Sequence, residues 1–159
     1  MITRVEEVPL NDYRQTVKLI FEKSKEYTGD ITSLFSEMSP IQFFDYVAKL
    51  PYKNDPETRI VNGKVVEGME LVHRPSIILD PKWTGSRDCD DKTNAIATYL
   101  RKKGYTFRIH VTGRGQEPRH IFLSAKFMGV WVPMDATYPG NKFGKLPYTP
   151  VYHKIFYEK

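Results

Sequence analysis

Cysteine is scarce in this sequence: Cys89 is the one cysteine among 159 residues. A single thiol cannot form an internal disulfide or a multi-cysteine zinc site. No apolar run approaches the ~18 residues of a membrane-spanning helix, and the first ten residues lack the basic start and apolar block of a secretory signal. These absences predict a protein of the reducing cytoplasm that has no membrane partner and no cofactor.

The composition is that of one globular domain covering residues 1–159. Apolar residues make up 40% and charged residues 27% of the chain, which supports a core at this length and argues against disorder. The charge is uneven, since residues 81–159 contain 14 Lys and Arg against 6 Asp and Glu. Because this half has no arginine-rich run or aromatic-basic motif, nucleic acid is not expected as a partner beyond weak polyanion binding.

Two helices are predicted in the N-terminal part, residues 1–49. The first covers residues 11–27, with Asn11 or Asp12 as its N-cap. The second begins at Ser39, a capping serine followed by a proline at the first helical position, and it ends before Pro51. The Asn62-Gly63 dipeptide then predicts a hairpin between residues 59–61 and 64–66. The apolar stripe of the second helix is expected to be buried and consists of Ile41, Phe43, Phe44, Val47, Ala48 and Leu50.

The strongest helix signal covers residues 89–103, after a loop at residues 74–87. Asp88 has the place of an N-cap, and Asp91 three positions later completes the spacing of a capping box. Basic residues at positions 101–103 suit the negative end of the helix dipole, and Gly104 is a typical C-terminal stop.

Three strands are predicted next, at residues 105–111, 119–127 and 129–134, with a tight turn at residues 128–129. His110 has polar residues as its alternate neighbours in the first strand and is expected at the surface. Residues 139–159 are predicted to be an irregular tail, with an edge strand over residues 151–157 as the alternative. The fold class is thus α+β: helices on an antiparallel sheet, with the helix of Cys89 packed against the face of the sheet.

Three residues of this scheme have the chemistry of thiol acyl transfer. Cys89 lies in the first turn of a helix, where backbone N–H groups and the helix dipole stabilise a thiolate. His120 opens the second strand and Asp135 follows the third. If Met128 and Gly129 are the turn residues, Asp135 is the diagonal cross-strand neighbour of His120. The carboxylate can then orient the imidazole, and the imidazole can take the proton of the thiol.

A family resemblance rests on these motifs. In their order along the chain they resemble the transglutaminase-like superfamily, which has a papain-like cysteine fold, and in particular a small phage and prophage branch with a Gly-Asp-Cys-Asp-Asp signature. The resemblance covers about residues 50–138 and implies a transglutaminase-like core there. It is carried by Arg87-Asp88-Cys89-Asp90-Asp91-Lys92, His120-Ile121-Phe122 and Trp131-Val132-Pro133-Met134-Asp135, with Tyr52-Lys53-Asn54-Asp55-Pro56 upstream.

The resemblance implies roles for individual residues. Cys89 would be the nucleophile, His120 the general base and acid, and Asp135 the residue that orients the histidine. The oxyanion would be held by the backbone N–H of Cys89 and by the indole N–H of Trp83. The implied reaction is hydrolysis or acyl transfer at a peptide or protein amide, in the host cytoplasm or in a virion. Arg87 stands where the branch has glycine and is expected to narrow access to Cys89.

Two alternatives stay open at this point. A non-catalytic phage structural or assembly protein would retain the same fold and have virion components as partners. A divalent-metal site would instead combine Asp88, Asp90 and Asp91 with His120. Three acids at one helix start point in different directions, and as N-cap and first-turn partners of the helix dipole they need no metal.

Overall fold

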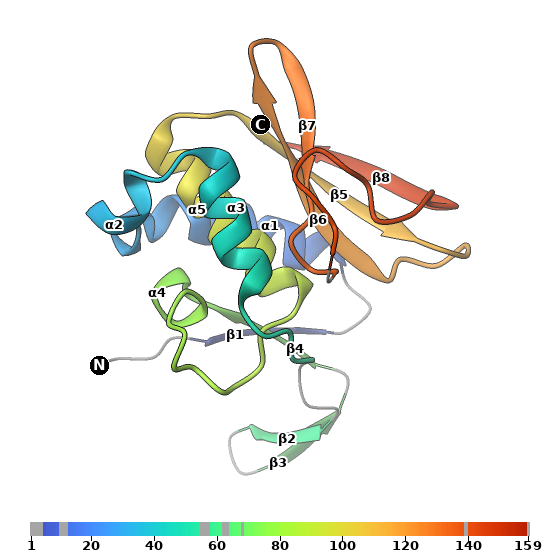
Figure 1. Cartoon of the computed structure of the whole chain (residues 1–159). Coiled ribbons are helices and arrows are strands. Elements are labelled where there is room, and N and C mark those ends of the chain that lie inside the picture. Colours follow the sequence, from blue (N-terminus) through green and yellow to red (C-terminus); the bar gives the residue numbers. More distant parts are fainter. Residues whose placement is uncertain are drawn as a thin grey trace.

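The computed structural model describes residues 5–9, 13–54, 58–61, 64–67, 69–138 and 140–158. Helices gather on one side of a four-stranded antiparallel sheet, and two short two-stranded ribbons complete the fold (Figure 1). The expected α+β class is confirmed at this level. In chain order the elements are β1 (Val5–Pro9), α1 (Tyr13–Glu26), a 3₁₀ turn (Thr28–Asp30), α2 (Ser33–Ser36), α3 (Pro40–Lys49), β2 (Thr58–Val61), β3 (Lys64–Glu67), β4 (Met69–His73), α4 (Pro75–Ile78), α5 (Cys89–Lys103), β5 (Phe107–Gly113), β6 (His120–Phe127), β7 (Val130–Met134) and β8 (Tyr152–Tyr157).

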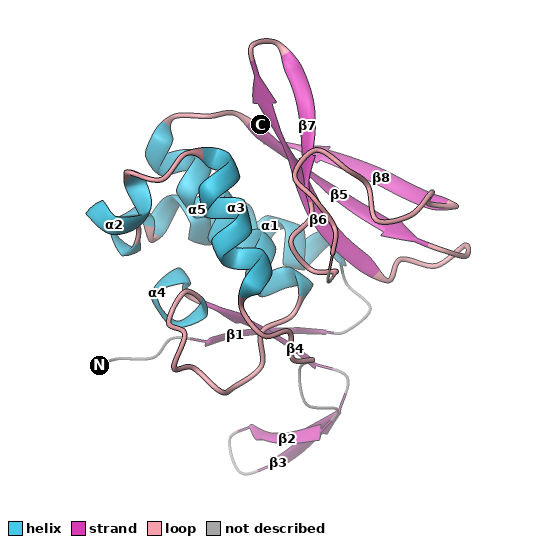
Figure 2. Ribbon diagram, viewed as in Figure 1, coloured by secondary structure: helices cyan, strands magenta, loops and turns pink. Residues whose placement is uncertain are grey.

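Helix α5 is the central element of the fold. Its residues from Asp90 to Leu100 are all buried, because α1, α3 and α4 pack around it and β6 packs along it (Figure 2). The strand residues that face α5 alternate along β5 and β6, because successive side chains of a strand point to opposite faces of the sheet. They are Ile109, Val111, Ile121 and Leu123, each at most 1% exposed.

Both ends of α5 lie where the sequence places them. The side chain of Asp88 accepts from the backbone N–H groups of Asp90 and Asp91, and the Asp91 carboxylate accepts from the backbone N–H of Asp88. These reciprocal bonds satisfy helix N–H groups that have no partner within the helix. Gly104 ends the helix in the left-handed conformation, with φ 81°, which a residue without a Cβ adopts at no steric cost.

Helix α3 is also confirmed, with one error in its buried stripe. Ser39 accepts from the backbone N–H of Gln42, and the Gln42 side chain accepts from the backbone N–H of Ser39, so the capping box is complete. Phe43 and Phe44 are at most 1% exposed, but Ile41 is 53% exposed. Position 41 lies about half a turn from Phe43 around the helix, so its side chain faces solvent.

The main sheet has the strand order β7-β6-β5-β8, with every neighbouring pair antiparallel. The predicted turn between β6 and β7 is confirmed: Met128 has φ 51° and Gly129 has φ 81°, and two positive φ values are typical of a type I′ hairpin turn. The register follows from this turn and pairs Leu123 with Met134. It brings the start of β6 and the residues just after β7 to one end of the sheet.

Two strand pairings differ from what the sequence predicts. Strand β8 pairs with β5 from Tyr152 to Tyr157, so the alternative of an edge strand over residues 151–157 is confirmed and the irregular tail is wrong for this stretch; its partner strand was not predicted. Strand β1 pairs with β4, with Val5 opposite His73, so the N-terminal part is not purely helical. The predicted hairpin of β2 and β3 is present, whereas its turn residues 62–63 and the predicted caps at 11–12 lie outside the described residues.

In the described part of the chain, no helix combines the length and the apolar character that crossing a bilayer requires. The longest helices, α1 and α5, are instead packed against each other in the core.

Candidate functional site

His120 and Asp135 are joined at the end of the sheet. His120 is the first residue of β6, and Asp135 directly follows the last residue of β7. Imidazole Nε2 lies 2.5 Å from Oδ2 of Asp135, and the two residues are 3% and 1% exposed. The other carboxylate oxygen accepts from the backbone N–H of Thr137 at 3.1 Å. Because an ionised carboxylate only accepts, Nε2 carries a proton and Nδ1 is left to exchange a proton with another group.

Aromatic side chains fix the plane of the His120 ring. Phe122 stacks with it at 5.8 Å between ring centroids, and Tyr138 meets it edge-on at 4.8 Å. Tyr148 lies 6.3 Å away, and its hydroxyl lies 2.9 Å from the hydroxyl of Thr112, the residue opposite His120 in the sheet. The segment that follows β7 therefore covers the imidazole and shields it from bulk water.

Cys89 is the first residue of α5 and is partly exposed. Its Sγ lies 3.6 Å from Oδ1 of Asp90, which is itself 1% exposed. Two opposing effects act on the thiol: the positive end of a helix dipole favours the thiolate, and the neighbouring carboxylate disfavours it. The two effects therefore oppose each other at the sulfur.

The first turns of α5 are attached to the residues next to His120 and Asp135. Positions three and four residues after Cys89 lie on the same face of the helix as Cys89. Lys92 donates through Nζ to the carbonyl of Ala136 at 3.2 Å, and Thr93 donates through Oγ1 to the carbonyl of Ile121 at 3.3 Å. The helix face that begins with Cys89 is thus the face bound to the segments that carry the imidazole and the carboxylate.

The Tyr138 phenol links the three residues electrostatically. Its pKa is raised to about 12, first by burial and then by Tyr148, Asp135 and Cys89. The same side chain packs on the His120 ring. Tyr138 therefore contacts His120 directly and lies within electrostatic reach of Asp135 and Cys89.

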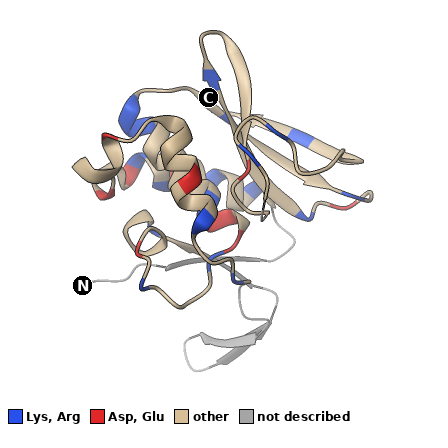
Figure 3. Cartoon of the chain, viewed as in Figure 1, with Lys and Arg blue, Asp and Glu red and all other residues tan. Residues whose placement is uncertain are grey.

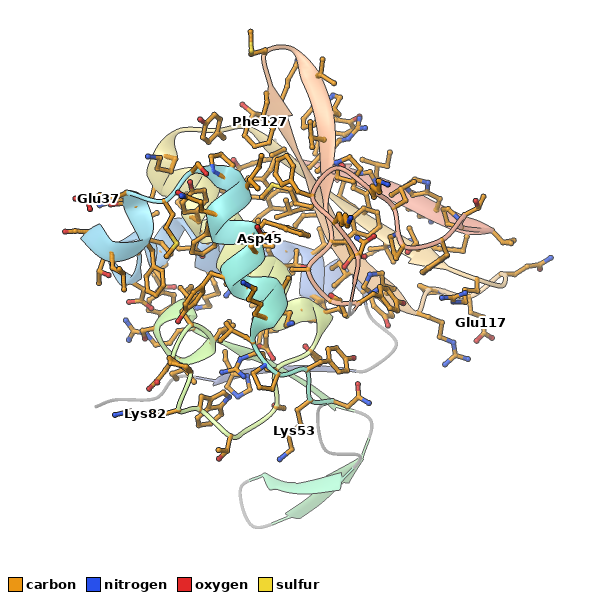
Figure 4. The ribbon with its side chains drawn as sticks, in the orientation of Figure 1. Glu37, Asp45, Lys53, Lys82, Glu117 and Phe127 are labelled. Atoms are coloured by element: carbon orange, nitrogen blue, oxygen red, sulfur yellow. The ribbon has the colours of Figure 1, made fainter. Side chains whose placement is uncertain are left out.

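Tyr52 also lies at this site, although no sequence motif singled it out as a site residue. Lys53 and Arg87 pair in an isolated antiparallel bridge, with N–O distances of 2.9 and 2.7 Å, which brings residues 52–54 beside the start of α5 (Lys53 is labelled in Figure 4). The pKa of Tyr52 is raised, first by burial and then by Cys89, Asp88 and Asp90. The one sequence signal for Tyr52 is that residues 52–56 resemble the corresponding stretch of the phage and prophage branch.

Arg87 does not narrow access to Cys89, so that expectation is wrong. The side chain is 1% exposed, and its guanidinium donates to four backbone carbonyls, at 2.9 Å to Ile78, 2.9 Å to Asp80, 3.2 Å to Pro51 and 3.5 Å to Trp83. Burial lowers the pKa of Arg87. The long side chain turns into the protein and binds the loop before α5, because those carbonyls need donors.

Trp83 does not offer a free donor to the site, contrary to expectation. Its indole Nε1 donates to the carbonyl of Ser86 at 3.1 Å. Its ring meets the His73 ring edge-on at 5.4 Å. An indole has one N–H and no other donor, so this hydrogen bond occupies the group that was predicted to hold the oxyanion.

The acidic residues around Cys89 organise the start of α5, where they form the red segment at the lower end of that helix in Figure 3. Asp91 is 0% exposed, and its carboxylate accepts from the backbone N–H of His73 at 2.9 Å. Imidazole Nδ1 of His73 lies 3.1 Å from the same carboxylate oxygen. In the residues that the structure describes, no group of three or more His, Cys, Asp or Glu is placed to hold a metal ion. The metal site considered above is not formed.

His110 is buried, so its expected place at the surface is wrong. It is 4% exposed, with Nε2 2.6 Å from the Ser124 hydroxyl and Nδ1 2.8 Å from Nε2 of His153. Its ring stacks on Phe122 at 4.6 Å. Burial, followed by His153 and Arg108, lowers the pKa of His110 to about 3. The reason is the pairing of β8 with β5, which the sequence did not predict and which covers this edge of β5.

Comparison of the chain with protein-family models, with curated proteins and with solved structures finds no match. The transglutaminase-like relationship therefore stays a prediction from the sequence motifs. What the site can do follows from its own geometry.

Proposed function

We propose that this chain is a thiol-dependent hydrolase or acyltransferase that acts on a peptide or protein amide and has a transglutaminase-like, papain-like core. The observation that carries the proposal is the buried bond between Nε2 of His120 and the Asp135 carboxylate, at 2.5 Å, beside the helix start that holds Cys89. A thiol, an imidazole and a carboxylate that orients the imidazole are the parts of nucleophilic acyl transfer.

Each residue has one task in the proposed reaction. His120 takes the thiol proton on Nδ1, and the Cys89 sulfur bonds to the amide carbonyl carbon. The oxyanion forms beside the backbone N–H of Cys89, at the positive end of α5. The carbon–nitrogen bond then breaks, and the departing amine takes the proton from Nδ1 of His120. Asp135 keeps the other ring proton on Nε2 throughout and stabilises the imidazolium.

The acyl-thioester that remains on Cys89 has two fates. Water gives a carboxylic acid, with His120 first taking the proton of the water and then returning it to the sulfur. A primary amine gives a new amide by the same proton transfers. Hydrolysis needs no second substrate, and for this reason we favour a protease or amidase over a cross-linking enzyme.

Alkylation of Cys89 tests the proposal without knowledge of the substrate. Iodoacetamide reacts with the thiolate, so the protein is expected to react rapidly near pH 7 and the His120→Ala variant slowly. His153→Ala is the matched control, because His153 lies exposed on β8 and bonds to His110 rather than to the candidate site. Equal alkylation rates in the protein and in His120→Ala contradict an ion pair between His120 and Cys89.

A second candidate function is a non-catalytic phage structural or assembly protein with the same fold. It is favoured by the cover over the site: the imidazole is 3% exposed beneath Tyr138, and the thiol lies against Asp90. This candidate predicts that Cys89 reacts with iodoacetamide no faster than an ordinary exposed thiol and that the protein co-purifies with virus particles. Hydrolysis of fluorescently labelled casein that is lost in Cys89→Ala excludes it.

A further inference from the structure

Lys92 is a buried lysine that connects three parts of the fold. Its side chain is 2% exposed. The ammonium donates to the carbonyl of Leu50 at the end of α3, at 2.9 Å, and to the carbonyl of Ala136 at 3.2 Å. Burying a cation has a large desolvation cost, and two neutral carbonyls do not neutralise the charge.

Lys92 binds the segment that carries the Asp135 carboxylate. Ala136 directly follows Asp135, so the hydrogen bond from Lys92 holds the backbone on which that carboxylate is mounted. The carboxylate itself is 1% exposed, and its two oxygens accept from Nε2 of His120 and from the backbone N–H of Thr137. Two charged groups act on the ammonium: Arg87 disfavours its protonated form and Asp135 favours it.

We propose that Lys92 is a positioning residue of the candidate site: its ammonium fixes residues 135–137 through the Ala136 carbonyl and stabilises the ionised Asp135 carboxylate, which in turn keeps the ring proton of His120 on Nε2. The inference rests on the proposed function, since it assigns Lys92 a part in the same site. A lysine that served only as a structural clamp would hold the Ala136 carbonyl but would have no effect on the imidazole through its charge.

Raising the pH removes this charge and leaves the hydrogen bonds in place. Burial lowers the pKa of Lys92 to about 8, and the neutral amine still has two N–H groups for its two carbonyls. The Tyr138 phenol does not interfere, because its pKa of about 12 is far above this range, and the pKa of Tyr52 is raised as well. The Cys89→Ala variant removes the thiol, so a change at the imidazole cannot come from the sulfur.

The experiment follows the ¹⁵N-labelled His120 ring of Cys89→Ala by NMR from pH 7 to 9.5. We expect the Nε2–H resonance to move with a midpoint near pH 8, because a carboxylate that has lost its cation pulls harder on that proton. The movement is expected to disappear in Cys89→Ala/Lys92→Met. It should persist in Cys89→Ala/Lys102→Met, which removes an exposed lysine from the same helix.

A His120 resonance that stays constant while the Lys92 amine titrates overturns the inference. A pH-dependent movement of this resonance that persists in Cys89→Ala/Lys92→Met overturns it as well. If the Lys92→Met variant does not fold, the pH series on Cys89→Ala with Lys92 present is sufficient to test the inference. With Cys89 present, Lys92→Met is expected to slow alkylation by up to about 100-fold, as a displaced catalytic group does. Rapid alkylation that Lys92→Met leaves unchanged rejects the inference and leaves the proposed function intact. Slow alkylation of the unsubstituted protein rejects the proposed function, whereas the pH-dependent movement of the His120 resonance still reports on Lys92.

Discussion

The imidazole of His120 and the carboxylate of Asp135 lie 2.5 Å apart across one hairpin, and both are buried. The hairpin of β6 and β7 has a two-residue turn, which leaves its register little freedom. Neither group has to move for the pair to form. The orientation of the imidazole is therefore a property of the folded chain and does not depend on a bound substrate.

Replacing this carboxylate is expected to impair the candidate site and preserve the fold. Asp135→Asn has the same shape, but its amide places no negative charge on the Nε2 proton and no longer stabilises an imidazolium. We expect alkylation of Cys89 by iodoacetamide at pH 7 to slow by about 100-fold, a typical contribution of general acid–base assistance. The measurement is the rate of carboxamidomethylation by mass spectrometry. The control is Asp45→Asn, on the solvent side of α3 (Figure 4), and equal rates in both variants reject the role of Asp135.

Arg87 is expected to matter for stability and not for access to the thiol. Arg87→Met leaves four backbone carbonyls without their donor, and a buried polar group that loses its partner costs about 1–3 kcal/mol. Part of this loss is offset because the charge of the guanidinium no longer has to be buried. The free energy of unfolding in urea should fall by about 3 kcal/mol. Arg119→Met is the control, because its side chain is 75% exposed, and it should change stability by less than about 0.5 kcal/mol. If Arg87→Met instead retained full stability and made Cys89 react faster, the side chain would be a gate after all.

The features predicted from the sequence are those that short stretches of chain determine. Helix α5 was predicted with both of its ends, because the capping acids and Gly104 act within one turn of the helix. The contact between His120 and Asp135 was predicted because a two-residue turn determines which residues face each other across a hairpin. Both features are determined by residues that are close together in the sequence.

The features that were missed depend on contacts between distant segments. Strand β8 pairs with β5 across more than 35 residues, and no turn signal marks such a pairing. Without β8 there is no reason to bury His110. The guanidinium of Arg87 and the indole of Trp83 were placed by family analogy, whereas the carbonyls of Ile78 and Ser86 that they bind become visible once the loop before α5 is folded. The buried charge of Lys92 could not be foreseen from its place in a polar helix start.

The buried His110 predicts that the protein loses stability in mild acid. The pKa of His110 is about 3 in the folded chain, against 6.5 for an unperturbed histidine. Between these values the unfolded chain binds the proton and the folded chain does not, so the free energy of unfolding falls as the pH drops below 6.5. From pH 7 to pH 5 this one group should account for a loss of roughly 2 kcal/mol.

A difference between variants isolates this effect from the carboxylates that titrate in the same range. His110→Gln keeps a donor and an acceptor for Ser124 and His153 but has no titrating group. The fall in unfolding free energy between pH 7 and pH 5, measured with urea, should be smaller in this variant by roughly 2 kcal/mol. His153→Gln should keep most of the fall, because burial, the largest cause of the lowered pKa, remains. If His110→Gln showed the same fall as the unsubstituted protein, His110 would take up its proton in the folded state, and the packing of β8 against β5 would have to open in mild acid.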